Sequence, residues 1–79
     1  MAHAQKKMDV IPTEMIVQIY TWEGLLHDAS TKLAYHLKMI LDGKEEHWGL
    51  LDENRKRVVF YNQEYTKAIL RLQRSQNKG

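Results

Sequence analysis

One acidic residue and one histidine in this sequence are spaced so that they could bind a metal ion together. Glu23 and His27 are four residues apart, which places them on one side of a helix. Metal sites in helical bundles need several inward-pointing glutamates and histidines, commonly spaced Glu-x-x-His, and that spacing occurs nowhere in this sequence. We therefore expect a solvated pair, with no metal ion and no cofactor.

A second grouping, Glu45-Glu46-His47, holds the side-chain types of general acid–base catalysis. Catalysis also needs a pocket that holds a substrate and shifts pKa values, whereas these residues fall in a short connection beside Lys44. The serines lack a triad context, and the scattered glycines form no phosphate-binding loop. The sequence thus predicts no catalytic residue, no enzymatic activity and no small-molecule substrate.

Charge is distributed unevenly along the chain. Residues 1–54 carry five Lys or Arg against nine Asp or Glu, and residues 55–79 carry seven against one. The basic half could bind a nucleic acid, or it could face the acidic half. The nucleic-acid hypothesis, kept as an alternative, uses the basic residues of a C-terminal helix: Arg55, Lys56, Arg57, Lys67, Arg71 and Arg74.

The same half holds apolar residues that point toward a protein partner. If Val58 and Tyr61 face a helix seam, a rotation of 100° per residue turns Val59 and Phe60 away from it. Exposed aromatic residues beside arginines are typical of protein interfaces. The predicted partner-binding residues are Trp48, Arg55, Arg57, Val59 and Phe60. The leading functional hypothesis is a non-enzymatic adaptor, inhibitor or regulator of a larger protein.

A seven-residue repeat predicts the elements that carry these residues. Apolar positions over about 13–41 recur at alternating spacings of four and three, as in helical bundles and coiled coils. Thr13 is the expected N-cap, and Asp42-Gly43 the expected stop. His36 interrupts the seam, and we expect its imidazole at the edge of the core. The predicted self-association residues are Ile19, Trp22, Leu26, Leu33, Leu37 and Ile40.

The second half fits two structures. Leu51, Val58, Tyr65 and Leu72 repeat every seven residues, which favours a helix over about 52–76 that is capped by Asp52. The run from Val58 to Tyr61 has high strand propensity, so a β-hairpin at 48–61 within an α+β fold is the alternative. In the helical interpretation, residues 44–51 form a connection that folds back over the end of the bundle.

These features predict an all-α fold: a flexible lead-in over 1–10 and one small domain over 11–79. With 79 residues and no cysteine, the chain has a small core and no disulfide to stabilise it. We therefore expect two hairpins to dimerise into a four-helix bundle. No signal sequence or membrane-spanning segment is recognisable, so a cytoplasmic protein with no membrane partner is expected.

Overall fold

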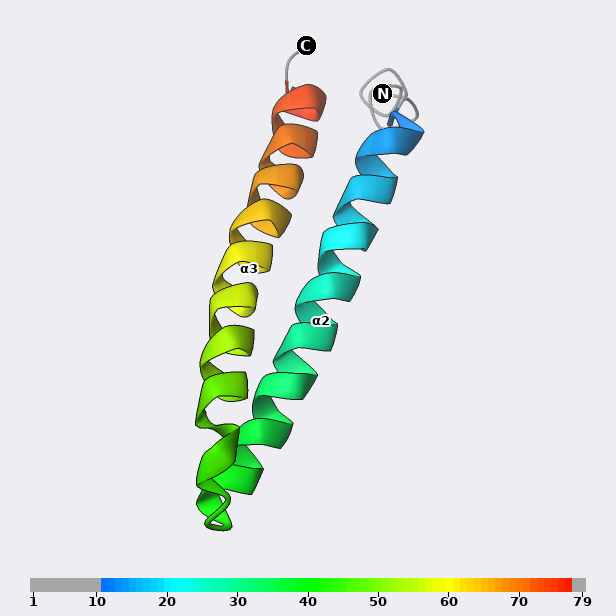
Figure 1. The fold of residues 1–79 in the computed structure, drawn as a ribbon. Helices are drawn as coiled ribbons and strands as arrows, with labels where there is room; N and C mark the ends of the chain where they lie inside the picture. The colour runs from blue at the N-terminus through cyan, green and yellow to red at the C-terminus, as the bar shows by residue number, and fades with distance from the viewer. Residues whose placement is uncertain (1–10, 78–79) are drawn as a thin grey trace.

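The computed structural model describes residues 11–77, so the predicted lead-in over 1–10 lies outside the described residues. Helix α2 spans Thr13–Leu41, a short 3-10 helix η2 spans Glu45–His47, and helix α3 spans Trp48–Asn77. The two long helices run antiparallel, with η2 at the turn and the start of α2 and the end of α3 at the opposite end (Figure 1). The predicted all-α helical hairpin is therefore confirmed.

The alternative β-hairpin at 48–61 is wrong, because this whole segment lies inside α3. The helix also begins at Trp48, four residues before the expected start at 52, so Asp52 does not cap it. Gly49 in the first turn lowers helix propensity by about 1 kcal/mol, which packing of the long seam outweighs. Trp48 and Leu50 therefore stay exposed in that turn instead of folding over the end of the hairpin.

The ends of α2 follow the sequence signals only in part. Pro12 is the N-cap and its carbonyl accepts a hydrogen bond from the Met15 N–H at 3.0 Å, so the prediction of Thr13 as the cap is wrong. Gly43 has φ 94°, which confirms it as the left-handed stop. The Gly43 N–H donates to the Ile40 carbonyl at 2.9 Å and the Lys44 N–H donates to the Met39 carbonyl at 2.9 Å. These two bonds form a Schellman motif, which fixes the direction of the turn.

Two contacts fix the register of the hairpin. The rings of Trp22 and Tyr61 lie 6.0 Å apart, and the Nδ1 atoms of His36 and His47 lie 2.9 Å apart. Each contact lies two heptads from the other on both helices, so the seven-residue repeat continues along the seam. Halfway between the two contacts, this register places Ala29 opposite residue 54.

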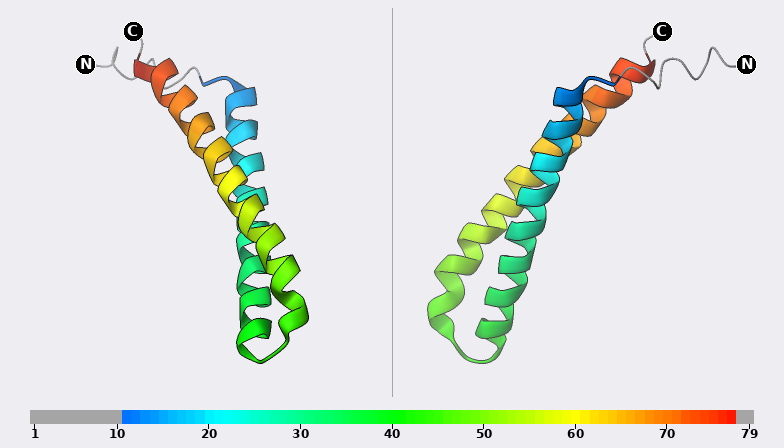
Figure 2. Two further views of the ribbon diagram at one scale, coloured as in Figure 1. Left: turned by 60° about the vertical axis from the view of Figure 1, so that its left-hand side comes forward. Right: turned by 90° about the vertical axis from the view of Figure 1, so that its right-hand side faces the viewer.

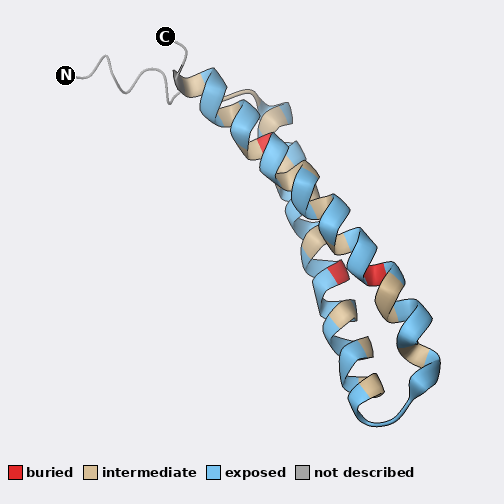
Figure 3. Cartoon of the chain, turned by 90° about the vertical axis from the view of Figure 1, so that its left-hand side faces the viewer, coloured by how far each residue is buried: buried red, intermediate tan, exposed pale blue. Residues whose placement is uncertain are grey.

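The seam buries few side chains. Only Ala29, Ala68 and Asn54 are buried among the described residues, and no large side chain is fully buried (Figure 3). The molecule measures 60 × 17 × 16 Å, so it is a narrow rod. Figure 2 shows that the two helices cross each other, and no third element within residues 11–77 covers them. Both flanks of the seam are therefore open.

Candidate interaction surfaces

The seam divides the hairpin into two faces. On one face, Arg71 Nη1 donates to Gln18 Oε1 at 3.2 Å, which joins the two helices. On the other face an open groove of about 280 Å³ lies between the helices. We call these the charged face and the groove face. Since the seam keeps a seven-residue register, residues seven or twenty-one apart on one helix lie on the same face.

The groove lies toward the open end of the hairpin. It is lined by five apolar or aromatic side chains and one carboxylate: Ile16, Ile19, Tyr20, Tyr65, Leu72 and Glu23. Small-molecule sites commonly have volumes of about 300–1,000 Å³ and enclose most of the ligand. A smaller, open groove fits one or two apolar side chains of a protein better than it fits a metabolite.

An apolar cluster lies on the groove face at the turn end. Leu37 and Leu41 follow Ile16 and Tyr20 by three heptads each, and their exposed fractions are 46% and 77%. His36 and His47 are in contact, and the next residue on each helix, Leu37 or Trp48, turns toward the groove face. Trp48 therefore lies beside Leu37 and Leu41, and it is 55% exposed. We call Leu37, Leu41 and Trp48 the turn cluster. Within the two helices, the groove face carries only three charged residues: Glu23, Asp52 and Arg55.

The charged face is different in composition. Leu25, Tyr35, Leu50 and Phe60 are exposed there, and the Phe60 ring meets the edge of Trp22 at 6.0 Å. Nine of the fourteen charged residues of the two helices lie on this face: Glu14, Asp28, Lys32, Glu53, Arg57, Glu64, Lys67, Arg71 and Arg74. Protein interfaces are depleted of charge at their centres, so the groove face resembles the centre of an interface more closely.

The structure separates the predicted partner-binding residues. Trp48, Arg55 and Val59 lie on the groove face, whereas Arg57 and Phe60 lie on the charged face. Trp48 is also about 17 Å along the helix from Val59. The five residues therefore lie on two separate surfaces.

The predicted self-association residues occupy the seam in all cases but one. Ile19, Trp22, Leu26, Leu33 and Ile40 are half-buried along the side of α2 that faces α3, and Leu37 is exposed on the groove face. Tyr20 and Leu41 are not among the residues predicted for either surface, although both lie in a second stripe that starts at Ile16 and continues by fours and threes. Polar residues occupy the middle of that stripe, at Glu23, His27 and Ser30, so its apolar pattern is not continuous in the sequence.

The basic residues of α3 are largely matched by carboxylates of the same helix. Arg55 and Lys56 pair with Asp52, Arg57 pairs with Glu53, and Lys67 pairs with Glu64. The fifth ion pair among the described residues, Asp28–Lys32, also lies within one helix. No ion pair within residues 11–76 thus joins α2 to α3. Of the six basic residues predicted to bind a nucleic acid, Arg71 and Arg74 are the two without an ion pair among the described residues.

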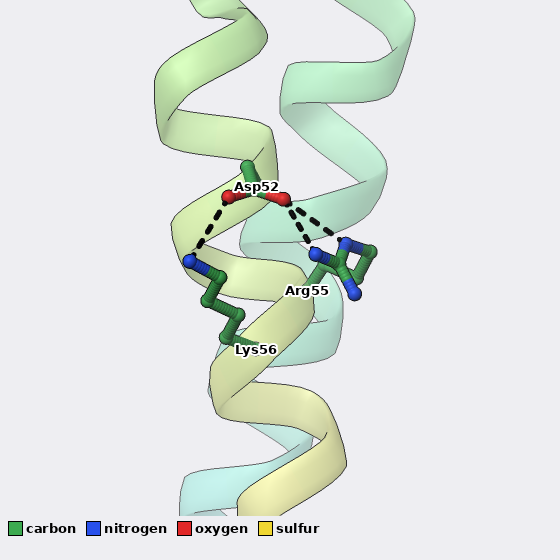
Figure 4. Close-up of polar contacts among 3 residues, drawn as sticks. All are labelled: Asp52, Arg55 and Lys56. Carbon is green, nitrogen blue, oxygen red and sulfur yellow. Dashed lines mark hydrogen bonds and ion pairs between the residues drawn. The ribbon is translucent and has the colours of Figure 1, made fainter.

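The Asp52 carboxylate is the centre of a charge cluster near the start of α3 (Figure 4). Arg55 Nη2 lies 2.6 Å from Oδ1, and Lys56 Nζ lies 3.3 Å from Oδ2. Hydrogen bonds from Arg55 and then Lys56 lower the pKa of Asp52 below its ordinary value of 3.8. A lowered carboxyl pKa stabilises the fold above the ordinary pKa, and this contribution is lost as the pH falls through the lowered value.

Asp52→Asn is expected to lower the melting temperature slightly at neutral pH, because the cluster is exposed and screened by solvent. The difference from the unaltered chain should shrink at acidic pH, as the pH falls through the lowered pKa of Asp52 and the carboxylate loses its charge. Thermal melts followed by circular dichroism at the two pH values measure this. Gln63→Asn, at an exposed uncharged position of the same helix, is the control and should show the same difference from the unaltered chain at both pH values. An equal deficit at both pH values would contradict the assignment.

Three aromatic rings lie close together next to the turn. The ring of Tyr35 meets those of His36 and His47 edge-on at 5.2 and 5.9 Å. The 2.9 Å separation of the two histidine Nδ1 atoms requires one ring to donate and the other to accept. His36 is half-buried, so the seam histidine lies at the edge of the core with one ring nitrogen satisfied by η2.

The other groupings that could do chemistry stay dispersed. Glu23, His27, Glu45 and Glu46 are exposed, and within residues 11–77 no three acidic or histidine side chains are placed to hold a metal ion. In the same part of the chain, no helix combines the length and the apolar character needed to cross a membrane. Comparison of the sequence and the fold with protein-family models, curated proteins and solved structures gives no match.

Proposed function

We propose that this chain is a non-enzymatic protein-interaction module that acts as a homo-oligomer, with two hairpins forming a four-helix bundle. One observation supports the proposal above all: the hairpin leaves twelve large hydrophobic side chains exposed and buries no large side chain completely. A soluble chain of this size gains its stability from apolar burial, and an isolated pair of helices buries too little of it.

Packing of a second hairpin supplies the missing burial. In four-helix bundles each helix contacts two neighbours, so its apolar stripe is wider than a single seam. Helix α2 has such a stripe, because Ile16 and Leu37 flank the seam on one side and Leu25 and Met39 flank it on the other. The seam itself is occupied by α3, and the flank with Ile16 and Leu37, on the groove face, is the surface through which association would take place.

A different protein is the partner proposed for the surface that self-association leaves open. Phe60 and Leu25 on the charged face are surrounded by charged residues, which is the arrangement of an apolar anchor within a polar rim. An adaptor or regulator needs such a second surface in addition to the one that holds its own copies together.

Sedimentation equilibrium tests the self-association directly. The measured mass is expected to exceed the 9.4 kDa of one chain. The melting temperature should rise with concentration up to about 200 µM, because dissociation is then linked to unfolding. A mass of one chain together with a melting temperature that is independent of concentration would refute the homo-oligomer.

A further inference from the structure

We infer that the groove face binds a second copy of this chain antiparallel, so that the turn cluster of each copy enters the groove of the other. The inference rests on the proposed function, since it specifies the face and the direction of the self-association. The contact is isologous: the turn cluster of each copy meets the groove of the other, so the same pair of surfaces occurs twice.

Shape is the first argument. The turn cluster projects from one end of the groove face, with Leu41 77% exposed, and the groove lies at the other end of that face. If two copies run antiparallel, both clusters reach a groove, and if they run parallel, cluster meets cluster and groove meets groove. Only the antiparallel arrangement therefore places a projecting cluster in each groove.

Charge favours the same direction. The turn carries Asp42, Glu45 and Glu46 against Lys44, whereas the open end of α3 carries Arg71 and Arg74. An antiparallel dimer brings the acidic turn of one copy near the basic end of the other, and a parallel dimer brings like charges together. Within one copy, no ion pair among residues 11–76 joins α2 to α3. In the antiparallel dimer, the acidic and basic parts of the chain attract each other between copies.

The groove carboxylate has a partner in this arrangement. When the cluster and the groove are superimposed, residues near position 36 of one copy lie level with residues near 23 of the other. Trp48 lies at the level of residue 36, because it follows His47, which contacts His36. Trp48 of one copy then lies level with Glu23 of the other, and the indole N–H is a donor that this carboxylate can accept from in the interface.

The area is sufficient for a stable dimer. Helices of about 30 residues are roughly 45 Å long at 1.5 Å per residue. The hairpin is 17 Å wide, so full overlap of two groove faces covers on the order of 1,500 Å² in total. Stable protein interfaces bury about 1,200–2,000 Å², and the low charge of this face keeps the cost of desolvation small.

Matched substitutions on the two faces test which face associates. Leu41→Asp and Tyr20→Asp place a carboxylate in the cluster and at the groove, at positions 77% and 67% exposed in the hairpin. Each is expected to weaken dimerisation about 30-fold or more, so that helicity is lost on dilution at a correspondingly higher concentration than in the unaltered chain. Phe60→Asp on the charged face is the control and should leave the dimer mass unchanged. Retention of the dimer by both groove-face variants would overturn the inference.

Spin labels test the direction. The chain has no cysteine, so Lys44→Cys and Thr31→Cys each give a single labelled site per copy. In the antiparallel dimer the labels at 44 are expected on the order of 40 Å apart, from the rise of 1.5 Å per residue, and those at 31 lie near the two-fold axis. A separation at 44 as short as that at 31 would overturn the inference but leave the homo-oligomer standing. A monomeric mass for the unlabelled chain would overturn both.

Discussion

Leu26→Asp is expected to abolish most of the helical circular-dichroism signal of this chain. Leu26 is half-buried in the seam, between Trp22, which packs on Tyr61, and the buried Ala29. A carboxylate there must either lose its hydration or force the helices apart, at a cost of several kcal/mol. Small domains have only about 3–5 kcal/mol of stability from a single core, so one such residue is enough to unfold the hairpin.

The matched control is Val17→Asp on the same helix. Val17 is 55% exposed, on the side of α2 that points away from the seam, so the same charge there meets water. Far-ultraviolet circular dichroism and sedimentation are expected to show an unchanged chain. If Leu26→Asp also kept its helicity and its mass, the seam between α2 and α3 would not be what holds the hairpin together.

The fold was predictable where local and long-range signals agree. Over 13–41 the heptad repeat and the Asp42-Gly43 stop both indicate one helix, and the structure has it at Thr13–Leu41. Over 48–61 they disagree, because the run from Val58 to Tyr61 has strand propensity while Leu51 and Val58 follow the repeat. The long seam outweighs the local preference, since helices in proteins are stabilised mainly by the packing of an apolar side.

The surfaces were less predictable than the fold, for a physical reason. A heptad repeat identifies the side of a helix that meets another helix, and it does not tell whether that helix belongs to the same chain. Leu33 and Ile40 therefore read as self-association residues although α3 lies along the same seam. Val59 and Phe60 are adjacent in sequence, but a rotation of 100° between them places them on opposite faces. Only the register between the two helices reveals the groove face.

Asn54→Leu is expected to raise the melting temperature by roughly 5–15 °C, which corresponds to about 1–3 kcal/mol in a domain of this size. Asn54 is 3% exposed, and its Nδ2 donates to the Leu50 carbonyl at 2.9 Å. Its Oδ1 has no hydrogen-bond partner among the described residues, so a buried acceptor is left unsatisfied. Leucine removes that acceptor and adds apolar contact opposite Ala29, the smallest residue of the α2 seam.

Thermal melts of Asn54→Leu and of Gln63→Leu separate this effect from a general gain in apolarity. Gln63 is exposed on the outer side of α3, so leucine at that position is expected to leave the melting temperature nearly unchanged. A lower melting temperature for Asn54→Leu would mean that the Asn54 amide is fully satisfied in the assembled protein.

Asn54→Leu is also expected to form oligomers of more than one size, although it is more stable. An asparagine at a seam position fixes register and oligomer size, because shifted arrangements bury its amide against larger apolar side chains. The Ala29–Asn54 level is the point in this hairpin where a small residue makes room for that amide. Sedimentation velocity is expected to show one species for the unaltered chain and several for Asn54→Leu. A single species of unchanged mass would mean that the shape of the groove face, and not the buried amide, selects the assembly.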